Sequence, residues 1–390
     1  MIKQFFDKVR PNFEDGGKLK AFRSVFEGME SFMLVPNTTA STGVSIHDAI
    51  DSKRIMSFVV IALLPALLFG MYNIGYQNAL LAGKLAETGF WSLFFYGFLL
   101  VLPKIIVSYV VGLGIEFAVA QWKREEIQEG YLVTGMLVPL IVPVDCPLWM
   151  LALAVAFSVI FCKEIFGGTG MNIFNPALVA RAFLFFSYPT SMSGDKVWVA
   201  QEQVLGLGYN LPDAATMATP LGEAAAGHVP AASLSDMILG FIPGSIGETS
   251  VIAIAIGALI LLYTQIASWR TMASVFAGGI VVSVLFNMAG PANNVAAAMP
   301  WYEHLVTGGF CFGAVFMATD PVTGARTENG KFVYGFLIGA VAILIRVLNP
   351  GYPEGMMLAI LLMNMFAPTI DYCIVQRNIS KRLNRAKVKP

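Results

Sequence analysis

The sequence has little charge and no clustered metal ligands. Only 13% of its 390 residues are charged, whereas soluble domains contain about 25%. The four cysteines never form a C-x-x-C pair, and His228 and His304 are isolated, so no zinc or cluster site is expected. Positive and negative residues number 25 each, so the net charge of zero does not favour a nucleic-acid partner. These absences leave a membrane protein as the main class.

Long apolar runs dominate what is present. A spanning helix needs about 20 mostly apolar residues, and ten candidate spans predict an all-α polytopic membrane protein. The third span is short and ends at the Pro143–Pro147 segment, which indicates a broken or re-entrant helix. The second is too long for one straight span and contains Pro103, so it is expected to begin along the membrane surface or to run tilted. The spans cover 55–75, 93–120, 131–145, 147–166, 173–189, 249–267, 271–289, 304–319, 332–348 and 355–376.

Basic residues alternate between the loops. The first 54 residues contain eight Lys or Arg and the tail 377–390 contains six, and every second loop is also basic. Cytoplasmic loops carry an excess of Lys and Arg. We therefore expect both termini in the cytoplasm and the long loop 190–248 outside. The basic residues between spans are Lys123, Arg124, Lys163, Arg270, Arg326 and Lys331.

A short internal repeat supports this count. The segment Met171–Pro176 reads MNIFNP and Met363–Pro368 reads MNMFAP, five spans later. An odd number of spans per copy inverts the second copy, which predicts two inverted five-helix repeats; a chance match in an apolar chain is the alternative. The expected divisions are an N-terminal extension (1–54), a first repeat (55–189), an external loop (190–248), a second repeat (249–376) and a basic tail (377–390).

The external loop contains the most informative motif. Its segment Asp213–Thr219, DAATMAT, resembles the Asp-x-x-Ser/Thr-Gly-Ala-Thr acceptor sequence, in which FMN is attached to the last Thr through a phosphoester bond. The resemblance predicts FMN on Thr219 and places Asp213 and Thr216 in the flavin-binding segment, with Asp213 read by the attaching transferase. Met217 stands where the acceptor sequence has Gly. The alternative is an ordinary turn in which Thr219 caps a helix and Glu223 is an acid of its first turn.

Five further segments are informative, and they touch spans 4 to 10: Lys163–Gly170, Asn175–Ala177, Gly244–Ser250, Phe316–Val322 and Pro353–Leu361. With them the whole chain resembles the NqrB/RnfD family, and within it the NqrB subunits of the bacterial sodium-translocating NADH:quinone oxidoreductase. That resemblance implies a urea-transporter-like fold in the bacterial inner membrane, covalent FMN, non-covalent riboflavin and a quinone site. It also implies a six-subunit complex that exports Na⁺ and in which another subunit binds NADH. The related RnfD subunit, a solute channel and a cofactor-free scaffold are the alternatives.

Small and amide side chains suggest where the other ligands bind. The turn Gly167–Gly170, which includes Gly168 and Thr169, precedes Asn172 and Asn175, and bare backbone N–H groups there suit flavin oxygens. A tight connection between spans is the alternative. Gly112 and Gly114 allow a quinone ring to approach the second span, where the resembled family has its quinone site. Close helix packing is the alternative for this pair.

Ionisable residues inside spans are costly and usually functional. Glu116, Asp320 and Asp371 fall at the expected cytoplasmic ends of spans, and their hard oxygens suit Na⁺, so we predict a sodium path through them. Helix capping is the alternative for Asp320. Arg181 and Arg346 lie inside spans and need a carboxylate, carbonyl oxygens or a ligand as partners. Salt bridges within the chain are favoured over a flavin phosphate or a quinone oxygen.

Overall fold

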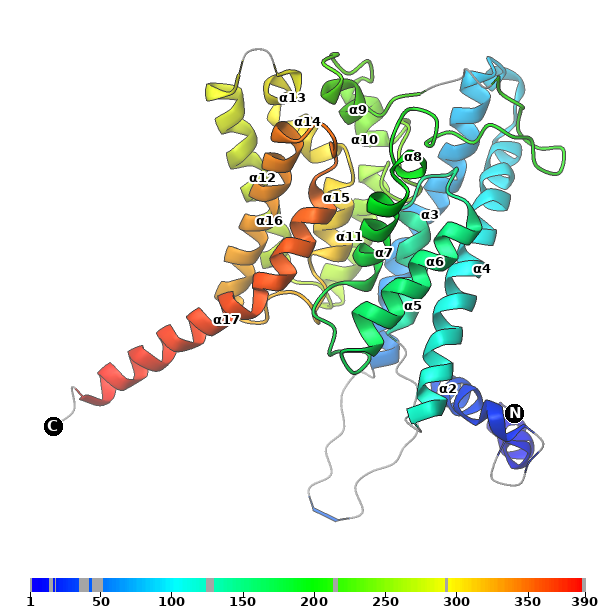
Figure 1. Cartoon of the computed structure of the whole chain (residues 1–390), viewed down its shortest axis with the longest axis vertical. Coiled ribbons are helices and arrows are strands. Elements are labelled where there is room, and N and C mark those ends of the chain that lie inside the picture. The colour runs from blue at the N-terminus through cyan, green and yellow to red at the C-terminus, as the bar shows by residue number, and fades with distance from the viewer. Residues whose placement is uncertain are drawn as a thin grey trace.

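The chain folds into a bundle of helices joined by loops (Figure 1). The computed structural model describes residues 2–13, 17, 19–34, 42–43, 52–123, 130–212, 217–291 and 294–387. Within them, 5 helices are long and apolar enough to cross a membrane. The protein is therefore an all-α, multi-pass membrane protein, as predicted. The five helices are α3 (Ser52–Leu81), α4 (Phe90–Lys123), α12 (Trp269–Ala289), α16 (Glu328–Leu348) and α17 (Met356–Lys387).

The other five expected spans contain short or interrupted helices. The helix at the third span, α5, has 10 residues, so it rises only about 15 Å, half of a bilayer core. The eighth span consists of three short helical pieces separated at Thr307–Gly309. These helices are α5 (Tyr131–Leu140), α6 (Leu148–Ser158) continued by η4 (Val159–Glu164), α7 (Pro176–Ser187), α11 (Val251–Tyr263), α14 (Trp301–Val306), α15 (Phe310–Phe312) and η5 (Gly313–Met317).

Two of the long helices extend beyond their expected ends. The helix α3 continues to Leu81 and α17 continues to Lys387, so the basic tail expected as a separate segment from residue 377 is part of α17. The helix α4 runs without interruption through Pro103 for 34 residues. Hydropathy misses such extensions because helices continue into water when nothing in the sequence stops them.

Glycines allow the long helices to pack closely in both halves of the bundle. A Cβ atom on Gly97 of α4 would lie 1.8 Å from the backbone oxygen of Met71 on α3. A Cβ atom on Gly339 of α16 would lie 2.0 Å from the backbone oxygen of Val275 on α12. Because lipid supplies no hydrophobic force between helices, such close backbone approach is a main source of association in a membrane.

The two ends of the bundle differ. The helices of the 190–248 loop and those before the eighth span lie at the top in Figure 1, whereas α2 and the C-terminal end of α17 lie at the bottom. The upper group comprises α8 (Pro189–Met192), α9 (Pro220–Ala225), α10 (Leu234–Leu239) and α13 (Val295–Ala298). The N-terminal extension contains α1 (Ile2–Val9), η1 (Arg10–Asn12), η2 (Lys20–Phe22) and α2 (Arg23–Met33), and η3 (Leu85–Glu87) follows α3.

One buried side chain fixes the first part of the upper loop. Asn78 on α3 donates from Nδ2 to the backbone oxygens of Ala200, at 2.9 Å, and Tyr209, at 3.0 Å. Its Oδ1 accepts from the Tyr209 N–H at 2.8 Å. Because the amide is fully buried, these bonds offset its desolvation and hold the loop against α3.

Candidate functional site

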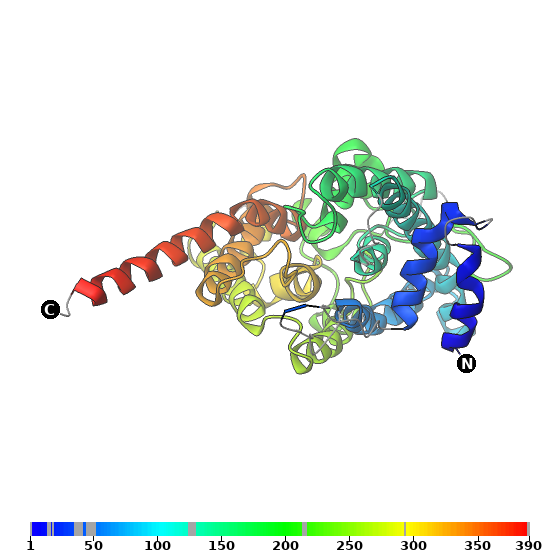
Figure 2. The same cartoon turned by 90° about the horizontal axis from the view of Figure 1, so that it is seen from below.

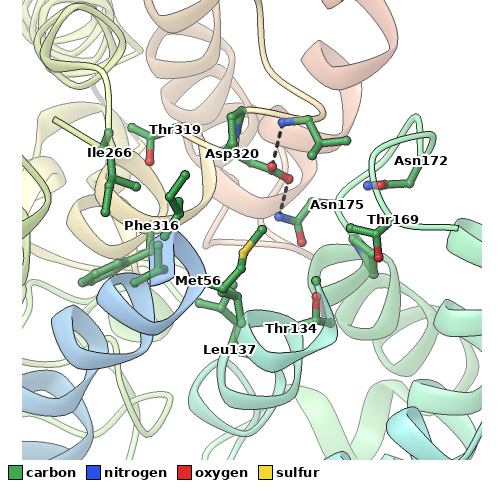
Figure 3. A pocket seen from close by; sticks show the side chains of 18 of the residues that line it. Met56, Thr134, Leu137, Thr169, Asn172, Asn175, Ile266, Phe316, Thr319 and Asp320 are labelled. Atoms are coloured by element: carbon green, nitrogen blue, oxygen red, sulfur yellow. Dashed lines mark hydrogen bonds between the residues drawn. The ribbon is translucent and has the colours of Figure 1, made fainter. Parts of the chain in front are cut away.

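A cavity of about 100 Å³ lies among the lower ends of several helices, and Asp320 is one of the residues that line it (Figure 3). We call it the Asp320 cavity. Its walls come from α3, α5, η4, the turn before α7 and the start of α7, the end of α11 and the segment after it, and η5 with the segment that follows. Most of its wall is apolar, and a few polar groups converge on it, which is the usual composition of a small-molecule site. The polar or charged residues lining it are Thr134, Lys163, Thr169, Asn172, Asn175, Thr319 and Asp320.

Asp320 connects the two halves of the chain. Its Oδ2 accepts from Asn175 Nδ2 at 3.1 Å and from Thr323 Oγ1 at 2.9 Å, and its Oδ1 accepts from the Val322 N–H at 3.0 Å. The carboxylate therefore caps the turn after η5, which was the alternative expected for it. These donors are all neutral, so the described contacts leave the negative charge of Asp320 without a cation.

The glycine turn supplies another part of the wall. Gly167, Gly168 and Gly170 adopt φ values of 111°, 94° and 90°, which favour glycine. Thr169 lines the cavity, and its Oγ1 is buried without a hydrogen-bond partner in the described structure. Asn172 also lines it and donates to the Phe174 backbone oxygen at 2.9 Å. The turn thus brings a free hydroxyl and an amide to one cavity.

The two copies of the repeated motif meet beside this wall. Asn175, in the first copy, caps α7 by accepting from the N–H groups of Ala177 and Leu178. Asn364, in the second copy, lies 2.7 Å from the Tyr334 hydroxyl. With its amide oriented so that the oxygen faces α7, Asn364 accepts from the Asn175 N–H at 3.3 Å. The repeat therefore places equivalent segments side by side, although their relation by an inverted axis stays a prediction.

Glu116 is joined to the cavity through a lysine. Its Oε1 forms a buried ion pair with Lys163 Nζ, and Lys163 lines the cavity. The other carboxylate oxygen, Oε2, is buried without a partner in the described structure. Lys163, counted above as a loop cation, is instead buried within η4, so that assignment was wrong. A single lysine inside an apolar run was the signal that could have identified this pair.

Asp371 lies apart from this cavity. Its carboxylate accepts from the N–H groups of Arg326, at 2.8 Å, and Thr327, at 3.0 Å, and from Thr327 Oγ1 at 2.6 Å. These bonds fasten α17 to the segment that begins α16. Of the three predicted acids, Asp320 and the Glu116–Lys163 pair therefore lie at the cavity, and Asp371 holds a neighbouring helix start.

The two glycines predicted to contact quinone face different surroundings. A Cβ atom on Gly112 would lie 1.9 Å from the Tyr131 ring, so Gly112 packs closely against α5. Gly114 is exposed and has open space around it. Since they are two residues apart on α4, they lie on different sides of the helix.

Two buried arginines, Arg181 and Arg346, bind the ends of the broken helices. Arg181 on α7 forms ion pairs with Glu248, at 3.1 Å, and with Glu354, and also donates to the backbone oxygen of Ile141 at the end of α5. The expected salt bridges are thus confirmed for Arg181. Sequence reasoning named neither acid as a partner. We call Arg181, Glu248, Arg346 and Glu354 the arginine network.

Arg346 donates hydrogen bonds to backbone oxygens. It donates to the carbonyls of His304, Thr307, at 3.0 Å, and Gly308, at 3.1 Å, and to that of Glu354 at 2.8 Å. The end of α14 would otherwise leave these carbonyls unsatisfied inside a membrane. The expectation of a carboxylate salt bridge for Arg346 was wrong, because the broken helix supplies carbonyls instead. Lys104 acts likewise on the break after α5, donating to the oxygens of Pro143 and Cys146.

Thr219 begins a short helix at the upper end. It is half-buried and caps α9, accepting the Gly222 N–H on Oγ1 at 3.1 Å. This is the capping role expected as the alternative to flavin attachment, and among the described residues the Thr219 hydroxyl has no acceptor for its proton. Leu221, in the same helix, packs on Gly308, which Arg346 holds. Asp213 and Thr216 lie outside the described residues.

Comparison with known proteins covers almost all of this chain. A model of the NQR2, RnfD, RnfE family matches residues 39–380. Proteins named as the NqrB subunit of Na(+)-translocating NADH-quinone reductase are similar over their full length. That of Ectopseudomonas mendocina is 44% identical over 98% of this chain and 99% of its own. That of Azotobacter vinelandii is 44% identical over 99% of both chains. With a family match that includes all ten expected spans and relatives that align over almost their whole length, the chain belongs to the NQR2, RnfD, RnfE family.

Proposed function

We propose that this chain is the flavin-carrying membrane subunit of a Na⁺-translocating NADH:quinone reductase. The observation that carries the proposal is the 44% identity to an NqrB protein over 98% of this chain and 99% of that relative. That match includes nearly all of the N-terminal extension, which RnfD proteins usually lack. The complex would pass electrons from NADH, bound on another of its six subunits, to quinone and couple this to Na⁺ export.

Thr219 is the proposed attachment residue for FMN. It ends the acceptor-like segment, and the structure leaves it half-buried at a loop-to-helix junction. The helix cap uses a lone pair of Oγ1, which an ester oxygen retains. The hydroxyl can therefore be esterified without unfolding α9. A flavin held there would supply one- and two-electron transfer.

Flavin fluorescence on a denaturing gel tests this assignment. Thr219→Ala should abolish fluorescence at the band of this chain, while the protein still inserts into the membrane. Thr216→Ala, in the same segment, is the matched control and should keep the fluorescence. A fluorescent Thr219→Ala band would refute the assignment, and a wild-type band without fluorescence would favour a solute channel or a scaffold.

Riboflavin is proposed to bind at the Asp320 cavity. The unpartnered Thr169 hydroxyl, the Asn172 amide and the glycine turn offer donors and acceptors toward one volume. Asn175 would keep Asp320 in place in the cavity wall. The residues suit a flat, polar-edged ligand, because the rest of the wall is mostly apolar and comes from α3, α5, α11 and η5 and from the segments next to them.

Sodium is proposed to enter past Asp320, Glu116 and Asp371. Carboxylates offset the cost of removing water from a hard cation. Asp320 is the best placed, because it borders the cavity and has only neutral donors as described partners. Glu116 would offer its Oε2, which has no described partner, as a ligand for Na⁺. Asp371 would act on the path through the segment before α16 that it holds in place.

Quinone is proposed to approach α4 near Gly112 and Gly114. Gly114 offers the open side, whereas a ring that reaches Gly112 must displace Tyr131. Gly114→Ala adds one methyl group in open space, so it should leave the fold intact and raise the KM for quinone. An unchanged KM would mean that Gly114 is an exposed residue that does not contact quinone.

Both termini are proposed to lie in the cytoplasm of a bacterial inner membrane, with the Thr219 loop outside. The charge pattern of the loops supports this orientation. A fluorescent protein that folds only in the cytoplasm, fused after Pro390, should fluoresce. A dark but full-length fusion would reverse the topology.

A further inference from the structure

The C-terminal part of α17 projects away from the bundle. Figures 1 and 2 both show it leaving sideways, beyond the neighbouring helices. From Tyr372 to Lys387 the helix contains 16 residues, so it is about 24 Å long. Topology and span length explain why α17 crosses the membrane, but they do not explain why it continues.

This segment has two distinct faces. Tyr372, Val375, Ile379 and Leu383 follow one another at intervals of three or four residues, so they form one stripe. They are between 43% and 64% exposed, so the stripe is open along its whole length in the described structure. An apolar stripe of this kind needs a partner outside this chain.

The opposite face is cationic. Arg377, Lys381 and Arg385 are spaced by four residues and lie across the helix from the stripe, and Arg382 borders it. From Tyr372 to the end of the sequence there is no Asp or Glu. The rule for membrane orientation requires only nearby positive charge, so it does not account for the aligned apolar residues.

We propose that residues 372–387 form an amphipathic helix that binds the anionic phospholipid surface where α17 leaves the membrane. Such helices place an apolar face in the headgroup boundary and cations near lipid phosphates. The charges favour a lipid surface over a protein groove, because the acidic residues that would pair with a protein partner's cations are missing from the segment. The segment extends away from its own bundle rather than beneath it (Figure 2), which leaves it free to contact lipid.

Two adjacent positions provide a matched test. Leu383 lies on the stripe and Asn384 on the polar side, and neither substitution removes a cation. In a Cys373→Ser background, which removes the exposed native thiol, Leu383→Cys and Asn384→Cys would each carry a nitroxide label. The full chain, and separately the whole complex, would be placed in vesicles of phosphatidylcholine with or without phosphatidylglycerol.

In the anionic vesicles, the label at 383 should be accessible to oxygen and shielded from a water-soluble nickel complex. The label at 384 should remain accessible to the nickel complex. Without phosphatidylglycerol, or with Arg377, Lys381 and Arg385 changed to Gln, the shielding should fall, by about fivefold for each cation removed. Equal water access at both positions in every vesicle would overturn the proposal. Shielding seen only in the whole complex and independent of phosphatidylglycerol would overturn it in favour of docking on a neighbouring protein of the complex.

Discussion

The Asp320 cavity and the arginine network are two buried polar clusters in one membrane protein, and they differ in how completely their groups are satisfied. In the network, Arg181 has two carboxylates and Arg346 has four described backbone oxygens. In the cavity, Thr169 Oγ1 has no described partner, and the charge of Asp320 meets only neutral donors.

This difference separates structural charge from functional charge. Ionisable residues inside spans are often read as functional sites, yet the arginines here complete the hydrogen bonding of broken helices. A cluster whose polar groups are all paired offers none of them to a ligand. A cluster that lines a cavity and keeps unpaired groups can bind one, so the Asp320 cavity is the better candidate for flavin and Na⁺.

The largest effect is expected from breaking the arginine network. Arg181→Gln leaves buried Glu248 and half-buried Glu354 without their cation, and breaking a buried pair costs about 3–5 kcal/mol in comparable cases. The folded fraction remaining after heating in detergent should fall sharply. Arg270→Gln, which breaks a pair with Glu328 that is 36% and 57% exposed, is the control and should change stability by less than about 1 kcal/mol. Similar losses in both variants would contradict a structural role specific to the network.

A smaller effect, on function rather than folding, is expected at Asp320. Asp320→Asn keeps the shape of the side chain and removes its charge. The Na⁺ concentration for half-maximal quinone reduction should rise about tenfold, as for loss of roughly 1.4 kcal/mol of cation binding. Asp371→Asn should raise it less, because Asp371 is held by donors of the α16 start. Unaltered Na⁺ dependence in both variants would leave these acids as caps.

The smallest effect is expected at a single hydroxyl. Thr169→Val removes the unpartnered Oγ1 at similar volume and should lower the riboflavin content of the purified complex by about threefold to tenfold. Thr249→Val is a matched control, because the Thr249 hydroxyl is also buried and unpartnered but lies outside the cavity. If both variants keep full riboflavin, the glycine turn is only a connection between spans.

The spans were predictable from sequence because apolar runs are local. All ten expected spans contain helices, and the break after Leu140 was indicated by its prolines. The pairs Arg181–Glu354 and Asn175–Asp320 were not predictable, since 173 and 145 residues separate their members. Lys163 was misplaced because a lone lysine near a span end resembles a loop cation. The free Thr169 hydroxyl emerges only when α5 and the glycine turn are packed together.

Mass spectrometry of the upper loop tests the central claim most directly. Cleavage after Glu202 and Glu223 releases the segment 203–223, in which Thr216 and Thr219 are the only threonines. We predict that this peptide, from the wild-type complex, carries the added mass of FMN less one water, as a phosphoester requires, and that fragmentation places the group on Thr219. An unmodified peptide, or FMN located on Thr216, would contradict the account.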